Sequence, residues 1–202
     1  MTNSPNISLP GLVRTVFLDR DGVLNEKMPE GSFVTSWRKF HLLPGVAEAI
    51  GRLNQAGVRV VVVSNQRGIE LGLYTAEDVR AIHDAFQNLL GVYGAHVDGF
   101  YFCPHDKAQC NCRKPLPGMF EQAASEFPDI TGGTSVMIGD SLSDIEFGSR
   151  LGMQTIFIEG NPKHCKPDVQ SASDLADLRF TSLAEAVKAL QVEQHSHRVS
   201  GG

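Results

Sequence analysis

Short apolar runs rich in β-branched residues alternate along the chain with longer segments in which apolar residues recur every three or four positions. The short runs predict buried strands. One of them, VRVVVVS, is almost continuously apolar, which is typical of a central strand in a parallel sheet. The predicted strands span residues 13–18, 58–64, 98–102, 134–140 and 154–159.

The longer segments predict amphipathic helices with recognisable end signals. Segment 43–57 ends at Gly57, a residue type that commonly terminates helices, and segment 117–127 opens on Pro117, which suits a first helical turn. A Ser or Thr followed three residues later by an acidic residue indicates a capped helix start. The predicted helices lie at 43–57, after Thr75 with Asp78, at 117–127, at 144–151, and after Ser182 with Glu185.

This alternation of strand and helix predicts an α/β fold, a Rossmann-like doubly wound, mostly parallel sheet with helices on both faces. We expect a single domain over residues 12–192. The termini, 1–11 and 193–202, are rich in polar residues, Pro, Gly and His, and we expect them to be flexible. Ligands of such sheets bind at the carboxyl ends of the strands, so the residues that end each strand are the first candidates for chemistry.

Composition narrows the class of protein. A chain of 202 residues with 42% apolar content suits one compact domain with a proper core. The net charge of −5 and the lack of a basic block argue against binding to nucleic acid. No apolar run is long enough to span a membrane, and the first residues lack the pattern of a signal peptide. We therefore expect a cytoplasmic protein with reduced cysteines, and a monomer.

Acidic and hydroxyl residues end three of the predicted strands. Asp19 and Asp21 follow the first strand, and such a pair indicates either a site for a hard cation such as Mg²⁺ or, equally, a solvated acidic turn. Ser64 ends the second strand, where it could hold a phosphate oxygen or simply form a turn. Asp140 ends the strand at 134–140 and could complete a cation site, whereas Asp144 could orient that site or cap a helix.

Together these strand ends resemble the haloacid dehalogenase (HAD) superfamily of phosphotransferases. The resemblance rests on the motifs FLDRDG, VVVSNQ, RKP and IGDSLSD, and it spans residues 13–159. It implies that Asp19 is the nucleophile that forms an aspartyl-phosphate and that Asp21 is the general acid and base. It also implies that Ser64 and Lys114 bind the phosphoryl group. The Mg²⁺ ligands that it implies are Asp19, the backbone carbonyl of Asp21, and Asp140, with Asp144 supporting them from behind.

The distances between these motifs leave no room for a large cap domain. About twenty residues separate Asp21 from Pro44, and a predicted helix and strand use most of the chain between Ser64 and Lys114. We therefore expect an open site shaped by short loops, with a small phosphorylated sugar or similar metabolite as its partner. The resemblance implies a substrate contact from Arg113, and Asn65, Gln66 and Arg67 are further candidates for substrate binding because they lie at or beside Ser64. Lys27, Arg38 and Lys39 are lesser candidates, for which the alternative is an ordinary solvated charge.

The stretch CPHDKAQCNCRKP holds three of the four cysteines and one histidine within ten residues. Four such ligands would fill a tetrahedral zinc shell and leave no open position, which indicates a structural metal rather than a catalytic one. A zinc-binding loop at 103–112 would then fix Arg113 and Lys114, which follow it directly. The predicted zinc ligands are Cys103, His105, Cys110 and Cys112.

This loop is similar to that of a HAD branch whose known members include D-glycero-D-manno-heptose 1,7-bisphosphate phosphatases and histidinol-phosphate phosphatases. The motifs DRDGVLNE, SNQRGI and CNCRKPLPGM look like those of the heptose enzymes, which implies hydrolysis of the 7-phosphate of the bisphosphate. The four residues between His105 and Cys110 are nearer the histidinol phosphatases, so histidinol phosphate and other small sugar phosphates stay open. The alternative from another class is a catalytically dead, zinc-stabilised binding protein.

Overall fold

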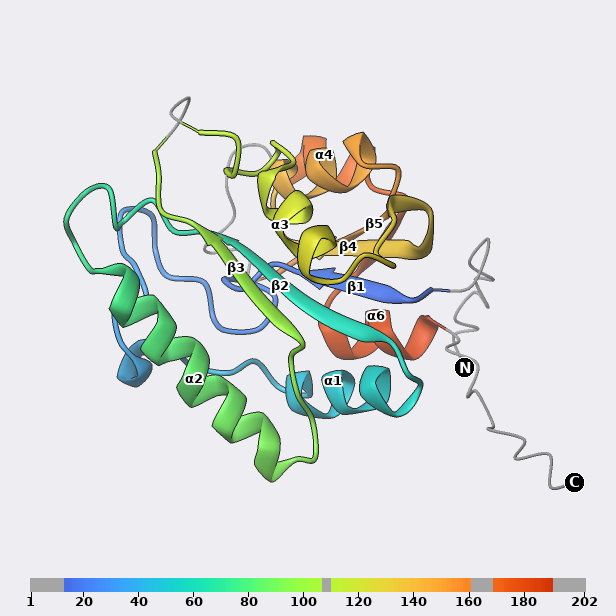
Figure 1. The fold of residues 1–202 in the computed structure, drawn as a ribbon, viewed down its shortest axis with the longest axis horizontal. Coiled ribbons are helices and arrows are strands. Elements are labelled where there is room, and N and C mark those ends of the chain that lie inside the picture. Colours follow the sequence, from blue (N-terminus) through green and yellow to red (C-terminus); the bar gives the residue numbers. More distant parts are fainter. Residues whose placement is uncertain (1–12, 107–109, 161–168, 191–202) are drawn as a thin grey trace, which may run out of the picture.

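Six strands form one sheet in the computed structural model, which describes residues 13–106, 110–160 and 169–190. The strand order is β3-β2-β1-β4-β5-β6, and every neighbouring pair is parallel (Figure 1). The termini predicted to be flexible lie outside the described residues, as do residues 107–109 of the predicted zinc loop. The strands are β1 (Thr15–Leu18), β2 (Arg59–Asn65), β3 (Gly99–Cys103), β4 (Ser135–Gly139), β5 (Gln154–Ile158) and β6 (Leu178–Phe180).

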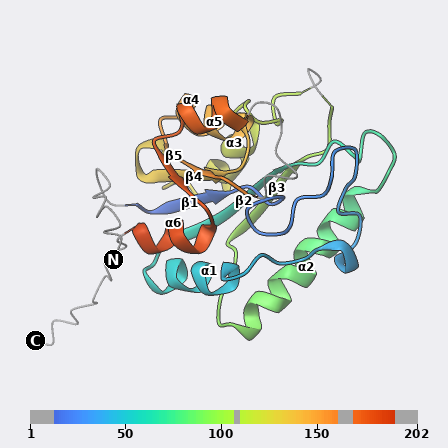
Figure 2. The same ribbon diagram turned by 180° about the vertical axis from the view of Figure 1, so that it is seen from behind.

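Helices cover both faces of this sheet. They are α1 (Val46–Gln55), α2 (Ala76–Val92), α3 (Gly118–Glu126), α4 (Leu142–Arg150), α5 (Val169–Leu175) and α6 (Leu183–Ala189). α1, α2 and α6 lie on one face, and α3, α4 and α5 lie on the other (Figures 1 and 2). None of the described helices has the length and apolar content needed to cross a membrane.

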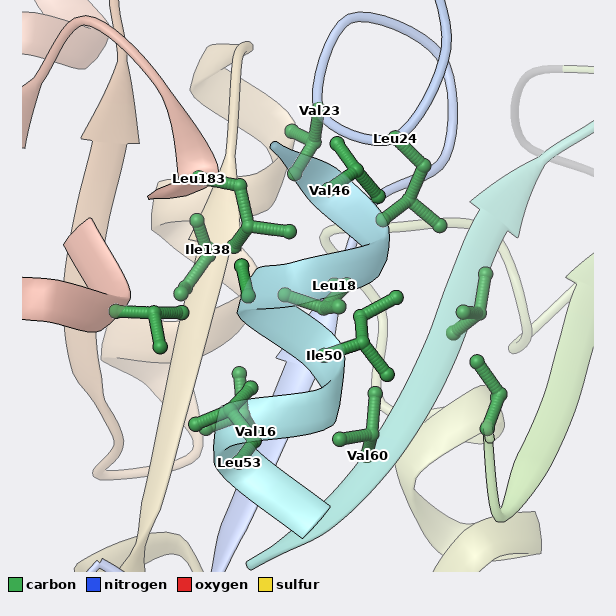
Figure 3. Close-up of a cluster of buried hydrophobic side chains, with 14 of the residues drawn as sticks. Val16, Leu18, Val23, Leu24, Val46, Ile50, Leu53, Val60, Ile138 and Leu183 are labelled. Atoms are coloured by element: carbon green, nitrogen blue, oxygen red, sulfur yellow. The ribbon is translucent and has the colours of Figure 1, made fainter. Parts of the chain in front are cut away.

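The side chains of the central strand β1 divide the core into its two layers. Val16 and Leu18 belong to the larger apolar cluster, which includes residues of α1, α2 and α6 (Figure 3). Phe17 lies between them in sequence and points to the opposite face, where it packs with Met119 of α3 and Phe147 of α4. Because strand side chains alternate between faces, a strand covered on both sides must be apolar throughout.

The predicted fold class is confirmed, and all five predicted strands form with ends shifted by no more than two residues. The predicted helices also form, but α4 begins at Leu142 rather than at Asp144. Its start is earlier because Ser141 is the N-cap and donates its hydroxyl to the Asp144 carboxylate at 2.6 Å. α5 and β6 were not predicted from the sequence, because they are short and carry weak periodicity.

The capping box predicted for α6 forms only in part. The Ser182 hydroxyl accepts a hydrogen bond from the Glu185 backbone N–H at 3.2 Å, as expected. The Glu185 carboxylate, however, accepts from the backbone and hydroxyl of Thr181, at 3.2 and 2.6 Å, rather than from the Ser182 backbone. The hydroxyl of Thr181 gives this carboxylate a second donor, which the Ser182 backbone alone would not supply.

No helical domain is inserted above the carboxyl ends of the strands in the described part of the chain. Between β1 and α1 the described chain forms only the short 3₁₀ helix Trp37–Lys39, and α2 is the only helix between β2 and β3. No large cap domain therefore covers the sheet in the part of the chain that the structure describes, as predicted. In the register of the sheet Leu18 pairs with both Val62 and Ile138, so the ends of β1, β2 and β4 meet at the point where the strand order reverses.

Candidate active site and metal sites

Three buried carboxylates and one lysine converge at the ends of β1 and β4. Asp19, Asp140 and Asp144 offer oxygens that lie within 4.8 Å of one another. The Lys114 Nζ donates to Asp19 Oδ1 at 2.7 Å and to the Val63 carbonyl at 2.6 Å, and it lies 2.6 Å from Asp144 Oδ1. These residues lie together although 95 positions separate Asp19 from Lys114, and the roles that the resemblance implies for them stay predictions.

The lysine of this cluster stays charged despite its burial. Burial by itself lowers the pKa of Lys114, but the charges of Asp144 and Asp19 outweigh it and raise the pKa above its ordinary value. The Lys114 side chain is only 1% exposed, so its ammonium balances two carboxylates in a space that water does not screen. The third carboxylate, that of Asp140, forms its ion pair with a different residue, Lys27.

Asp140 is a carboxylate whose charge a bound metal would change. Burial raises its pKa to about 7, the neighbouring charges of Asp19 and Asp144 add to the effect, and Lys27 opposes it through an ion pair. The three-carboxylate donor set consists only of hard oxygens, which suits Mg²⁺. A divalent cation here would favour the ionised form of Asp140, so the residues present fit such an ion.

Two glycines make this close packing possible. Gly22 has a φ of 101°, and a Cβ added to it would lie 2.0 Å from Asp140 Oδ2. A Cβ added to Gly139, which precedes Asp140, would lie 2.2 Å from the Asp144 Cβ. Any larger residue at either position would push a carboxylate out of the cluster.

The Asp21 carboxylate lies among hydrogen-bond donors from three other residues. Arg20 holds it with two nitrogens at 2.8–3.2 Å, Asn25 Nδ2 donates at 3.0 Å, and Gln66 Nε2 donates at 3.1 Å. Burial raises the pKa of Asp21, but the Arg20 charge and these hydrogen bonds lower it below its ordinary value. The described arrangement therefore favours the ionised form of Asp21.

The residues at the carboxyl end of β2 form hydrogen bonds within the protein. The Ser64 hydroxyl is buried and accepts from Gln66 Nε2 at 2.6 Å. The Asn65 side chain forms two hydrogen bonds with the Lys114 backbone: Nδ2 donates to the carbonyl at 3.1 Å, and Oδ1 accepts from the N–H at 3.0 Å. The predicted substrate contacts of Asn65 and Gln66 stay predictions, and the structure gives both residues the additional task of positioning the site.

Two arginines lie beside this edge, and each is tied to the loop that begins at Cys103. The Arg113 guanidinium donates to the His105 carbonyl at 3.2 Å, and Arg67 Nε lies 3.8 Å from an Asp106 oxygen. The Arg67 side chain is 43% exposed, which leaves it accessible to a ligand. Their predicted roles in substrate binding stay predictions.

The predicted zinc ligands form a compact cluster. Cys110 Sγ lies 3.4 Å from Cys103 Sγ and 3.3 Å from Cys112 Sγ. The His105 Nδ1 atom lies 3.3 Å from Cys112 Sγ and 3.7 Å from Cys103 Sγ. A tetrahedral zinc with Zn–S bonds of about 2.3 Å has S–S edges of about 3.8 Å, so a small expansion would admit the ion. The donor set of three sulfurs and one imidazole fits zinc and does not suit Mg²⁺.

Arg20 and Tyr74, which had no predicted role, and Lys27 lie at the site. Arg20 is 1% exposed and holds Asp21, and Tyr74 donates its hydroxyl to Gln66 Oε1 at 2.8 Å. Lys27, a lesser candidate from the sequence with a solvated charge as the alternative, is paired with Asp140. The structure therefore does not support a solvated Lys27, and the signal in the sequence was its position a few residues after Asp21.

This arrangement of strand-end carboxylates and a buried lysine agrees with the comparisons with known proteins. Residues 111–186 match the family model described as HAD-hydrolase-like. The chain is 39% identical over 176 residues to the D-glycero-alpha-D-manno-heptose-1,7-bisphosphate 7-phosphatase of Mycobacterium tuberculosis, covering 87% of this chain and 90% of the relative. The chain therefore belongs to the HAD family of phosphatases, which are phosphoric monoester hydrolases.

Two further relatives are similar to the chain over most of its length. The D-glycero-beta-D-manno-heptose-1,7-bisphosphate 7-phosphatase of Rhodopseudomonas palustris is 38% identical over 153 residues, which cover 71% of this chain and 82% of the relative. The solved structure of the D,D-heptose 1,7-bisphosphate phosphatase of B. bronchiseptica, complexed with magnesium and phosphate, matches with a TM-score of 0.76 at 32% identity. That match covers 87% of this chain and 97% of the solved one.

Proposed function

We propose that the chain is a Mg²⁺-dependent phosphatase that removes the 7-phosphate of D-glycero-D-manno-heptose 1,7-bisphosphate through an aspartyl-phosphate on Asp19. The observation that carries the proposal is the pairing of the Asp19 carboxylate with buried Lys114 in a cluster that includes Asp140. Phosphoryl transfer needs mainly position and neutralised charge, and this cluster supplies both. The names of the relatives support the choice of substrate.

In the proposed reaction an Asp19 oxygen forms a bond to phosphorus while the bond from phosphorus to the sugar oxygen breaks. Asp21 gives a proton to that oxygen, which leaves as the sugar hydroxyl. The ionised Asp21 then takes a proton from water, and the water oxygen attacks phosphorus as the bond to Asp19 breaks. Phosphate leaves, and both carboxyl groups return to their starting states.

The donors around Asp21 favour the second half of this reaction. Arg20, Asn25 and Gln66 hold the Asp21 carboxylate in the ionised form, which is the form that accepts a proton from water. The first half requires a protonated Asp21. Because the Arg20 charge is the largest influence that lowers this pKa, we expect the side chain to turn away from Arg20 when it acts as an acid.

Two metals complete the proposal. Mg²⁺ would be held by Asp19, the backbone carbonyl of Asp21, and Asp140, and when bound it would neutralise charge on the nucleophile and the phosphoryl oxygens. Lys114 and Ser64 would bind phosphoryl oxygens, and Asp144 would hold Lys114 in place. Zinc on Cys103, His105, Cys110 and Cys112 would be structural and would fix the segment that carries Arg113 and Lys114.

The part of the substrate beyond the transferred phosphate would contact two arginines, Arg67 and Arg113. Arg67 and Arg113 are anchored beside the zinc cluster, and their planar guanidinium groups suit the second phosphate of a bisphosphate better than the imidazole of histidinol phosphate. The relatives include enzymes named for the alpha and for the beta anomer, so both anomers belong in the test.

A substrate panel tests the proposal most directly. Both anomers of the heptose bisphosphate, histidinol phosphate and hexose monophosphates would be compared by phosphate release with Mg²⁺ present. We expect the highest kcat/KM on one heptose bisphosphate anomer, whereas a preference for histidinol phosphate would overturn the substrate assignment. Absence of turnover on the whole panel would favour a binding protein on an inactive scaffold.

A variant pair tests the nucleophile. Asp19→Asn should abolish turnover and retain the fold, because the amide cannot form the acyl-phosphate. The matched control is Asp129→Asn, which changes an exposed carboxylate that pairs with Arg59 and should leave activity unchanged. Substantial residual activity in Asp19→Asn would rule out Asp19 as the nucleophile.

A further inference from the structure

The ion pair between Lys27 and Asp140 brings a second lysine into the carboxylate cluster. Lys27 follows Asn25, and bridges from Asn25 to Asp21 and to Leu42 fix this part of the chain beside the end of β1. The Lys27 side chain is 18% exposed, and its ammonium contacts an Asp140 oxygen. A merely solvated lysine would not be held against a carboxylate that is itself 7% exposed.

The charge balance of the cluster shows what this ammonium contributes. Asp19, Asp140 and Asp144 together carry three negative charges, which Lys114 and one divalent cation would neutralise completely. The nearby Asp21 carboxylate is already balanced by Arg20. An incoming phosphate dianion would then meet a neutral cluster unless Lys27 supplies the remaining positive charge.

The same pair places Lys27 in competition with a metal. Asp140 Oδ2 is confined on one side by Gly22 and on another by the Lys27 ammonium, so a cation that binds this carboxylate must share it with Lys27 or displace the lysine. Whether Lys27 shares Asp140 with the cation or is displaced by it, its ammonium stays beside the cluster and donates fewer hydrogen bonds to Asp140. An anion is the natural partner for the donors that become available.

We infer that Lys27 is an anion-binding residue of the phosphoryl site, held by Asp140 until a divalent cation engages that carboxylate and then available to a phosphate oxygen. This inference rests on the proposed function, because it takes a metal and a phosphate ester to be the ligands. It predicts opposite effects of one substitution on two ligands. Loss of the Lys27 charge should strengthen Mg²⁺ binding and weaken phosphate binding.

The test uses the full chain and the variants Lys27→Gln and Lys39→Gln. Lys39 is exposed in the same part of the chain, so its substitution makes the same change in net charge away from the cluster. Calorimetry would measure Mg²⁺ affinity without phosphate, and then the affinity for inorganic phosphate at saturating Mg²⁺. For Lys27→Gln we expect Mg²⁺ to bind about tenfold tighter and phosphate about tenfold weaker, the range for losing a charged hydrogen bond.

The outcome that would overturn the role of Lys27 differs from the outcome that would refute the proposed function. Lys39→Gln should bind both ligands as the wild type does, and Lys27→Arg should retain most of the phosphate affinity. An affinity of Lys27→Gln for either ligand that equals the wild-type value would overturn the inference, even where the wild type hydrolyses its substrate normally. A wild type that binds Mg²⁺ and phosphate but hydrolyses no ester would instead refute the proposed function.

Discussion

A buried histidine should make the stability of this protein fall in mild acid. His83 lies on α2, is 4% exposed, and stacks on Phe100 with ring centroids 4.6 Å apart. Burial, together with the nearby Arg20 charge, lowers the pKa of His83 from 6.5 to about 3, although the Asp21 charge opposes the shift. Its Nε2 atom has no hydrogen-bond partner in the part of the chain that the structure describes, so no acceptor there would stabilise a proton on Nε2.

The size of the effect follows from the two pKa values. In the unfolded chain His83 takes up a proton below its ordinary pKa, whereas in the folded chain it stays neutral down to about pH 3. Its contribution is therefore fully present above pH 6.5 and is lost as the pH falls towards 3. At 1.36 kcal/mol for each pKa unit, folding at pH 5 should be about 2 kcal/mol less favourable than at pH 8.

The assay must separate His83 from other titrating groups. The raised pKa of Asp140, about 7, acts in the opposite direction, because it removes stability as the pH rises from 3.8 to 7. We therefore compare the unfolding free energy of the wild type with that of His83→Leu in urea at pH 8 and pH 5, so that shared contributions cancel. The difference in unfolding free energy between the wild type and His83→Leu should shift by about 2 kcal/mol in favour of the variant when the pH falls from 8 to 5.

The matched control is His96→Leu, because the His96 side chain is 55% exposed and lies 3.5 Å from an Asp98 oxygen. This substitution should not reproduce the shift, since an exposed ring stays hydrated in both protonation states. A gap between the wild type and His83→Leu that stays constant within about 0.5 kcal/mol from pH 8 to pH 5 would refute the reasoning.

Two further predictions concern the metal sites. Gly22→Ala should lower Mg²⁺ affinity and turnover by more than about tenfold, because its Cβ would meet Asp140 Oδ2 at 2.0 Å. The control Gly57→Ala is also at positive φ but has open space around it, so it should cost about 1–2 kcal/mol of stability and leave turnover intact. Equal losses of turnover in the two variants would contradict this prediction. Metal analysis of the wild type should find about one zinc per chain, and Cys112→Ser should lose zinc and several kcal/mol of stability. A wild type without zinc, titrating as free thiols, would exclude the structural metal.

The sequence by itself determined the fold class and most of the candidate site. Continuous apolar strands require cover on both faces, so the pattern of β1 and β2 already implied a doubly wound sheet. Parallel strands end at one edge, and for that reason the sequence alone assigns Asp19 and Asp140 to one place. The spacing of the four zinc ligands is similarly local, since all of them lie within ten residues.

The tertiary structure decided the contacts between residues far apart in the chain. Lys27 meets Asp140 across 113 positions, and Gln66 joins Tyr74 to Asp21, pairings that no local periodicity encodes. A lone charge in a loop has the same sequence signature whether water or a buried carboxylate surrounds it, because only the packed neighbours set its environment. The sequence thus determined which groups can perform phosphate chemistry, and the fold decided which of them are paired, buried and held ready.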